Sequence, residues 1–216
     1  DVTPVDNVYL VGTTATFNGK LTPAGDAVIG TLTVDGNVTF GAASQYYVTL
    51  NGATSDKLVV TAGDTVTLTA GADLDGQGSS LHSVGDAFTI IDNPGAVAIV
   101  GTFADGAAIT ISGQDYGIDY ATGSDVTLTR SQMTWTWDGG GANDNWTTVA
   151  NWTADSWYPA DGDIAIFTGV VRPTPSNDIV GRTLDSIIFN AGGFTLGGNA
   201  LTLSNGLNNA VGTNTI

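Results

Sequence analysis

Short runs in which polar and apolar residues alternate cover most of the chain, and their period of two is that of β-strands. Threonine alternates with an aliphatic residue in Thr-Leu-Thr-Val (31–34) and Val-Thr-Leu-Thr (126–129), which leaves one face apolar and the other mildly polar. Turn-forming pairs such as Asp35-Gly36 and Asn51-Gly52 separate these runs. The pattern therefore predicts many short strands joined by tight turns.

The composition also favours strands. All 21 acidic residues are Asp, and Lys and Arg together number only 5, so the strongest helix formers among the charged residues are almost absent. Threonine, valine, isoleucine and tyrosine, which suit a pleated surface, are common instead. The sequence predicts an all-β protein.

Two all-β architectures fit the spacing of the runs. Strands that recur roughly every 8–12 residues occur both in the coils of a solenoid and in β-sandwiches. The many small residues and the repeated threonine–aliphatic pattern favour a parallel β-helix, in which like side chains stack from coil to coil. The Asn-Gly and Asp-Gly pairs could instead close tight hairpins, which keeps antiparallel β-sandwich modules as the alternative.

Two long stretches resemble a known family. The stretch from Leu21 to Asp75, closed by Asp-Val-Thr-Leu-Thr-Arg at 125–130, resembles the passenger-associated transport repeat of bacterial autotransporters. Its matching parts are Pro23 with Gly25, and the runs at 30–34, 47–52 and 55–60.

The tryptophan-rich stretch at 134–152, followed by Asp-Ile-Ala-Ile-Phe-Thr-Gly at 163–169, is similar to the opening of a second autotransporter-associated β-strand repeat. The resemblance thus divides the chain into a first module over residues 1–130 and a Trp-rich second module over residues 131–216. It implies a right-handed β-helix in a secreted or cell-surface protein of a Gram-negative-type bacterium. The implied role is a non-catalytic passenger, stalk, fibre or adhesin.

The charge of the chain narrows the choice of partners. A formal net charge of -16 repels nucleic acid and anionic membrane surfaces, so neither is expected as a partner. No segment approaches the roughly 20 consecutive apolar residues of a membrane-spanning helix, so membrane insertion is not expected either. Cysteine is absent, which excludes disulfides and thiolate chemistry.

Four of the five tryptophans lie within residues 134–152. Such aromatic surface could bind surface glycans, or it could close the junction between two repeats as a hydrophobic plug. Two of these residues are spaced i, i+2 and so share one strand face, which suits a common core. We favour the plug, which would consist of Trp135, Trp137, Trp146, Trp152 and Trp157.

Aspartate-rich loops are candidates for calcium, because Ca²⁺ prefers oxygen ligands on flexible backbone. None of these loops completes the twelve-residue pattern that ends in a bidentate Glu, and aspartate is also an ordinary turn residue. Calcium binding is therefore a hypothesis for Asp73, Asp75, Asp138, Asp144, Asp161 and Asp163.

Catalysis has little support in the sequence. His82 is the sole imidazole and lies among serines in a polar segment, where an isolated histidine is usually solvated. No G-x-S-x-G motif accompanies it, and no cationic cluster accompanies the aspartates. We predict no catalytic residue and no cofactor other than the possible calcium. A β-helix that binds or cleaves carbohydrate through the Trp-rich region is the alternative.

The two ends of the sequence suggest assembly. Residues 1–21 begin, and residues 206–216 stop, as though within a repeat, and the last run followed by the first would continue the β pattern. Solenoid ends without polar caps pair with other strand edges. We therefore expect copies stacked head to tail as a homo-oligomer or filament, or one longer polypeptide that repeats the unit.

Overall fold

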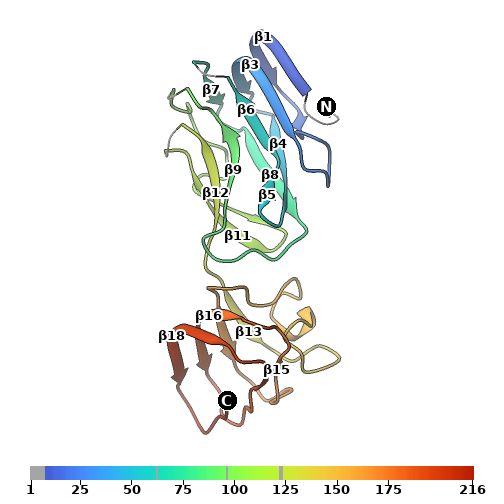
Figure 1. Cartoon of the computed structure of the whole chain (residues 1–216), viewed down its shortest axis with the longest axis vertical. Coiled ribbons are helices and arrows are strands. Elements are labelled where there is room, and N and C mark those ends of the chain that lie inside the picture. The colour runs from blue at the N-terminus through green and yellow to red at the C-terminus, as the bar shows by residue number, and fades with distance from the viewer. Residues whose placement is uncertain (1–7, 62, 96, 122–123) are drawn as a thin grey trace. The chain divides into compact units, whose positions relative to one another are not determined.

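The computed structural model describes residues 8–61, 63–95, 97–121 and 124–216 (Figure 1). In these ranges the chain forms strands and one 3-10 turn, η1 (Val149–Asn151), and no α-helix. The prediction of an all-β protein is confirmed.

The chain forms two compact units, which are unit 1 (Asp1–Ser80 and Asp86–Arg130) and unit 2 (Leu81–Gly85 and Ser131–Ile216). Residues 81–85, which the sequence-based division put in the first module, pack with unit 2.

Unit 1 has two sheets with its core between them. An 8-stranded sheet has the order β1-β3-β6-β9-β12-β11-β10, with β7 also on β3, and a smaller sheet joins β2, β4, β5 and β8. The strands are β1 (Val8–Phe17), β2 (Lys20–Leu21), β3 (Thr31–Phe40), β4 (Gln45–Asn51), β5 (Thr54–Ser55), β6 (Lys57–Val60), β7 (Val66–Leu68), β8 (Asp73–Gly78), β9 (Ala87–Asp92), β10 (Ala108–Ile111), β11 (Gln114–Asp119) and β12 (Val126–Arg130).

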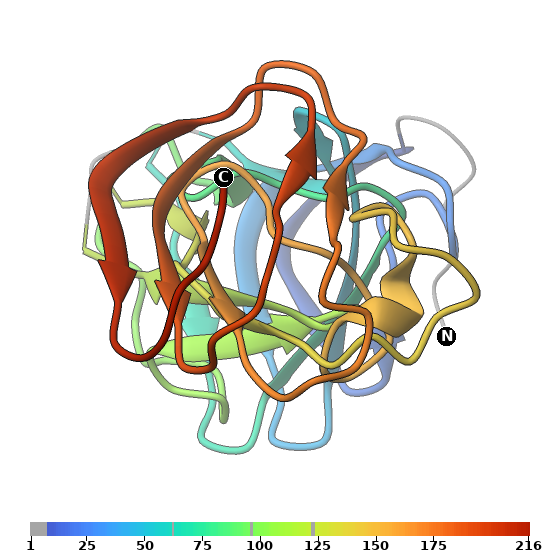
Figure 2. The same ribbon diagram turned by 90° about the horizontal axis from the view of Figure 1, so that it is seen from below.

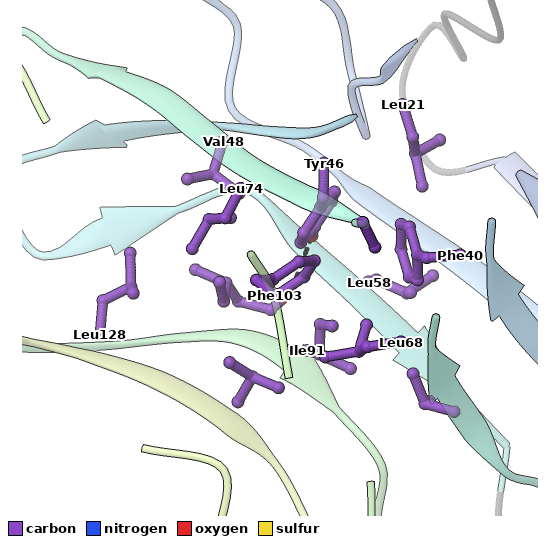
Figure 3. Packing of buried hydrophobic residues seen from close by; sticks show 14 of the residues in the cluster. Leu21, Phe40, Tyr46, Val48, Leu58, Leu68, Leu74, Ile91, Phe103 and Leu128 are labelled. Atoms are coloured by element: carbon purple, nitrogen blue, oxygen red, sulfur yellow. Dashed lines mark hydrogen bonds between the residues drawn. The ribbon is translucent and has the colours of Figure 1, made fainter. Parts of the chain in front are cut away.

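Strand direction changes within the large sheet of unit 1. The pairs β1–β3, β3–β6 and β6–β9 are parallel, whereas β9–β12, β12–β11 and β11–β10 are antiparallel. Burial alternates strictly along β3, so its aliphatic residues and Phe40 face inward. Figure 3 shows Phe40, Tyr46 and Phe103 together in this core, with ring centroids 5.5–6.3 Å apart. The Tyr46 hydroxyl donates a hydrogen bond to the Ile90 carbonyl (2.7 Å), which satisfies a buried polar group.

Unit 2 is built from parallel pairs. Its main sheet has the order β13-β14-β16-β18, and a smaller sheet pairs β15 with β17 (Figure 2). These strands are β13 (Thr134–Trp137), β14 (Ile164–Phe167), β15 (Ser176–Asn177), β16 (Thr183–Phe189), β17 (Gly197–Gly198) and β18 (Thr202–Asn209). Trp137, Phe167 and Phe189 are in register on successive strands, so their rings form an inward ladder. Parallel pairing of successive strands places equivalent residues of the chain one above another.

Candidate functional site

The tryptophan-rich region forms the core of unit 2. Trp135 and Trp137 point inward from β13, and Trp146 and Trp152 enter from the loop that follows. None of these four side chains is more than 3% exposed. Trp152 meets Trp137 and Trp146 edge-to-face, with centroids 5.2 and 5.7 Å apart and interplanar angles of 87° and 88°. These geometries are favourable for aromatic rings and leave no ring face open to a glycan.

Three of the four buried indoles have their N–H group satisfied inside unit 2. The indole nitrogen of Trp135 donates to Asp163 Oδ2 (2.8 Å), that of Trp137 to the Arg172 carbonyl (3.1 Å) and that of Trp152 to the Trp146 carbonyl (2.8 Å). The indole nitrogen of Trp146 is buried and has no hydrogen-bond acceptor among the described residues. These three hydrogen bonds fix the indole rings within unit 2.

The fifth tryptophan differs from the others. Trp157 is only partly buried and packs against the same core together with Tyr158. The guanidinium carbon of Arg182 lies 6.0 Å from the centroid of the Tyr158 ring, at the limit of a cation–π contact. Trp157 and Tyr158 are thus the aromatic side chains of this region that keep some exposed surface.

Asn151 organises the Gly/Asn/Asp loop, a role that the sequence analysis did not find. Its Oδ1 accepts the Gly141 amide (3.0 Å), and its Nδ2 donates to the carbonyls of Asn143 and Asn145 (2.9 Å each). A Cβ atom on Gly141 would lie 2.7 Å from Asn151 Oδ1, so glycine is required for this approach. The loop is held by a buried amide.

Asp163 is the buried carboxylate of unit 2. It is fully buried and accepts the amides of Met133 (2.8 Å) and Ala160 (3.0 Å) in addition to the Trp135 indole. Three donors on one carboxylate compensate for its loss of hydration. This side chain joins the start of β13 to the turn before β14.

Two of the other aspartates proposed as calcium ligands are paired with arginine. Asp144 Oδ1 is 3.0 Å from Arg172 Nη1, and Asp161 Oδ1 is 2.9 Å from Arg182 Nη1. The hydrogen bond from Arg172, followed by that from Thr174, lowers the pKa of Asp144. Salt bridges of this kind oppose cation binding, because the carboxylate charge is already neutralised.

The remaining candidates make hydrogen bonds to uncharged groups. Gln45 Nε2 donates to Asp73 (3.2 Å) and to Asp75 (3.4 Å), and Asp138 accepts the Gly140 amide (3.0 Å). Within the described ranges no group of three or more His, Cys, Asp or Glu side chains is placed to hold a metal ion. Calcium binding by these aspartates stays an untested hypothesis.

The expectation of a solvated His82 is wrong. The side chain is 2% exposed, in the segment 81–85 that packs with unit 2. The Val84 amide in this segment donates to the Asp161 carbonyl (2.9 Å). Residues 81–85, which look like a solvent-exposed polar segment in the sequence, thus pack against a distant part of the chain.

Both units have hollows among their described residues, and two of them lie at apolar side chains. One of about 430 Å³ in unit 2 is lined mainly by Ile187, Leu196, Leu201 and Leu203. One of about 190 Å³ in unit 1 lies along β1, beside Leu10 and Ala15. No charged side chain lines either hollow, so neither resembles a catalytic cleft.

No protein-family model matches the sequence, and searches among curated proteins and solved structures find no match either. No helix in the described residues is long and apolar enough to cross a membrane.

Proposed function

We propose that the chain is a non-catalytic structural protein of the bacterial cell surface or extracellular space, such as a passenger, stalk, fibre or adhesin. Its parallel ladders are coils of a right-handed parallel β-helix, and its copies join head to tail. The observation that carries this proposal is the burial of Trp135, Trp137, Trp146 and Trp152, because the largest aromatic surface of the chain is used for internal packing.

The β-helix part of the proposal is supported by the parallel ladders. β14, β16 and β18 pair in parallel and in sequence order, with Ile164 opposite Ser186 and Ser186 opposite Gly206. The length of chain between one paired position and the next thus fits one coil of a solenoid. In unit 1 the ladder β1–β3–β6–β9 has the same order and direction. Such coils make stiff, extended scaffolds.

The polar groups also support a structural role. Asp163 and Asn151 are buried and bonded to backbone amides and carbonyls of their own unit. Asp144 and Asp161 are paired with arginines. These groups stabilise loops, and that is the use expected of them in a scaffold.

A carbohydrate-binding or carbohydrate-cleaving β-helix is the second candidate. It would use the partly exposed surface of Trp157 and Tyr158, with Arg182 beside the latter ring. Two rings that also pack on the core offer little stacking surface, so we rank this function second.

Glycan binding and hydrolysis distinguish the two functions. The protein is applied to a glycan array and incubated with bacterial and plant polysaccharides, and reducing ends are measured. We expect no specific binding and no release of reducing ends. Binding that Trp157→Ala abolishes, and that Val180→Ala at an 85% exposed site preserves, would establish the second candidate instead.

The location is tested in the source cells. An antibody against the folded protein should label intact cells or detect the protein in the culture medium. Labelling that requires permeabilised cells would contradict a surface or extracellular role.

A further inference from the structure

Two parallel edge strands, one in each unit, lack charge along their whole length. β18 ends the main sheet of unit 2, and β1 ends the large sheet of unit 1 (Figure 1). Neither strand contains a charged residue, and no charged side chain occurs anywhere in residues 7–19 or 186–216. In a chain with a net charge of -16, these are long neutral stretches.

Exposed strand edges are normally protected against pairing. Proteins place lysine, proline or inward-pointing charges there, because unpaired backbone N–H and C=O groups accept any further strand. In the described residues β18 pairs only with β16, and β1 pairs only with β3. Their only irregularity is one register shift each, between Val11 and Thr14 on β1 and opposite Leu184 and Ser186 on β18.

The segments after these register shifts correspond to each other. Residues 14–17 of β1 and 206–209 of β18 each pair without a break with the strand inside them. In these segments Ala15 is opposite the buried Val38 and Leu207 is opposite the buried Ile187, so both point to the core side of their sheets. Two four-residue segments with the same inward alternation can form one continuous parallel ladder.

The side chains at these edges are complementary in size. Leu207 is 50% exposed, whereas Ala15 is small and borders the hollow of about 190 Å³ along β1. Leu10, which faces inward opposite Val34, has a counterpart in Leu203 beside the hollow of about 430 Å³. The protruding Leu207 could pack over the small Ala15, and Leu203 could pack beside Leu10, which suits close packing.

We propose that β18 of one copy pairs in parallel with β1 of a second copy, with Leu207 of the first against Ala15 of the second and Leu203 of the first against Leu10 of the second. The inference rests on the head-to-tail part of the proposed function and names its contact surface. Neutral edges let two strongly acidic chains approach without placing aspartates against each other. Since the two edges differ, the contact is heterologous and extends into a filament unless its rotation closes a ring.

Cysteine pairing tests the contact directly, because the chain has no cysteine of its own. The variants Ala15→Cys and Leu207→Cys are mixed under mild oxidation, with one of them isotope-labelled so that its mass identifies mixed pairs. Neighbouring strands lie about 4.8 Å apart, within the range of Cα separations that a disulfide spans. We expect the mixed disulfide to dominate.

Two outcomes of this experiment would overturn the contact. Leu207→Cys pairing mainly with itself would indicate two β18 edges in a symmetric contact. Equal crosslinking to Ala108→Cys, a matched alanine replacement on the exposed edge strand β10, would indicate random collision.

A charge at the edge gives a second measurement. Leu207→Asp should raise the concentration at which half of the chains associate by about tenfold or more, because the contact would bury an unpaired carboxylate. Val180→Asp adds the same charge at an 85% exposed position outside β18 and should leave association unchanged. Tryptophan emission verifies that both variants stay folded.

The results separate this contact from the proposal beneath it. Filaments that persist in Leu207→Asp would overturn the β18–β1 contact while head-to-tail assembly stands. A wild-type protein that remains monomeric would overturn both the contact and head-to-tail assembly, whereas the glycan experiment alone decides the non-catalytic role.

Discussion

Unit 1 and unit 2 are built from the same alternating strands, but they fill their interiors with different side chains. The core of unit 1 consists mainly of valine, leucine and isoleucine on strands as long as ten residues. The core of unit 2 has strands of four residues at β13 and β14, and four tryptophans together with three phenylalanines fill it. Short strands offer few inward positions, so each must supply more apolar area.

The two units also differ in how they hold a buried carboxylate. In unit 1 Asp56 is fully buried and accepts the amides of Gly30 (2.8 Å) and Thr49 (2.7 Å), and its burial raises the pKa of the carboxyl. In unit 2 Asp163 accepts two backbone amides and an indole N–H. Both residues tie a strand to a turn, but Asp163 also fixes a core ring.

Removing one ring should give the largest difference between the units. Trp152→Ala should lower the free energy of unfolding of unit 2 by about 3–5 kcal/mol, because it leaves a cavity among Trp137, Trp146 and Phe167. Chemical denaturation, followed by tryptophan emission and circular dichroism, measures it. The transition of unit 1 should not move.

Leu58→Ala is the matched change in unit 1, since Leu58 is fully buried in β6. It should cost about 2–5 kcal/mol in the transition of unit 1 only. A loss below about 1 kcal/mol for Trp152→Ala would contradict a packed tryptophan core and restore an exposed glycan platform.

Removing the carboxylate of unit 2 should have the next largest effect. Asp163→Ala leaves the buried N–H groups of Met133, Ala160 and Trp135 without this acceptor. Each unsatisfied buried group costs about 1–3 kcal/mol, so we expect a loss of at least about 2 kcal/mol in unit 2. Asp138→Ala, which removes one hydrogen bond from an exposed turn, is the control and should change little. Equal losses for the two variants would refute this assignment.

The stability of unit 1 should depend on pH through Asp56, with a smaller effect than the two substitutions above. Burial raises the pKa of Asp56 above the model-peptide value of 3.8, so the folded state holds this proton more tightly than the unfolded chain does. The contribution of Asp56 to stability therefore rises as pH falls through the interval between its unfolded and folded pKa, and is lost as pH rises through it.

Asp56→Asn removes this titration. Denaturation midpoints of unit 1 measured from about pH 7 to pH 4 should show a flatter slope in the variant than in the wild type. Asp144 in unit 2 gives the opposite sign, because its lowered pKa means that stability is lost as pH falls through that pKa. Identical slopes in wild type and Asp56→Asn would exclude a role for Asp56.

Much of the strand pattern could be predicted from the sequence, since alternation reports which side chains share a face. Strand direction could not, because the period of two is the same in parallel and antiparallel ladders. The antiparallel β9–β12–β11–β10 part of unit 1 is therefore invisible in the pattern. Of two neighbouring loop aspartates, Asp161 faces an arginine and Asp163 is buried under an indole. Only tertiary contacts make that distinction, and the same holds for the buried His82.

The joining of the two ends that the sequence suggests concerns residues 1–7 in part, which lie outside the described residues. The contact between β18 and β1 does not depend on them, because both strands lie within the described ranges. The sequence leads to the hypothesis of assembly but to no contact surface, since edge strands are defined only once the pairing order is known.

Calcium should have the smallest effect. In unit 2, arginines neutralise Asp144 and Asp161, whereas in unit 1 Asp73 and Asp75 accept hydrogen bonds from the uncharged amide of Gln45. At a net charge of -16, any salt should stabilise both units by screening repulsion. We expect calcium chloride and sodium chloride at matched ionic strength to raise both melting transitions equally, and chelator to have no further effect. A calcium-specific increase in unit 1 that Asp75→Asn removes would contradict this expectation and locate a site on β8. The same increase in unit 2, lost in Asp144→Asn, would show that calcium displaces Arg172 from its carboxylate.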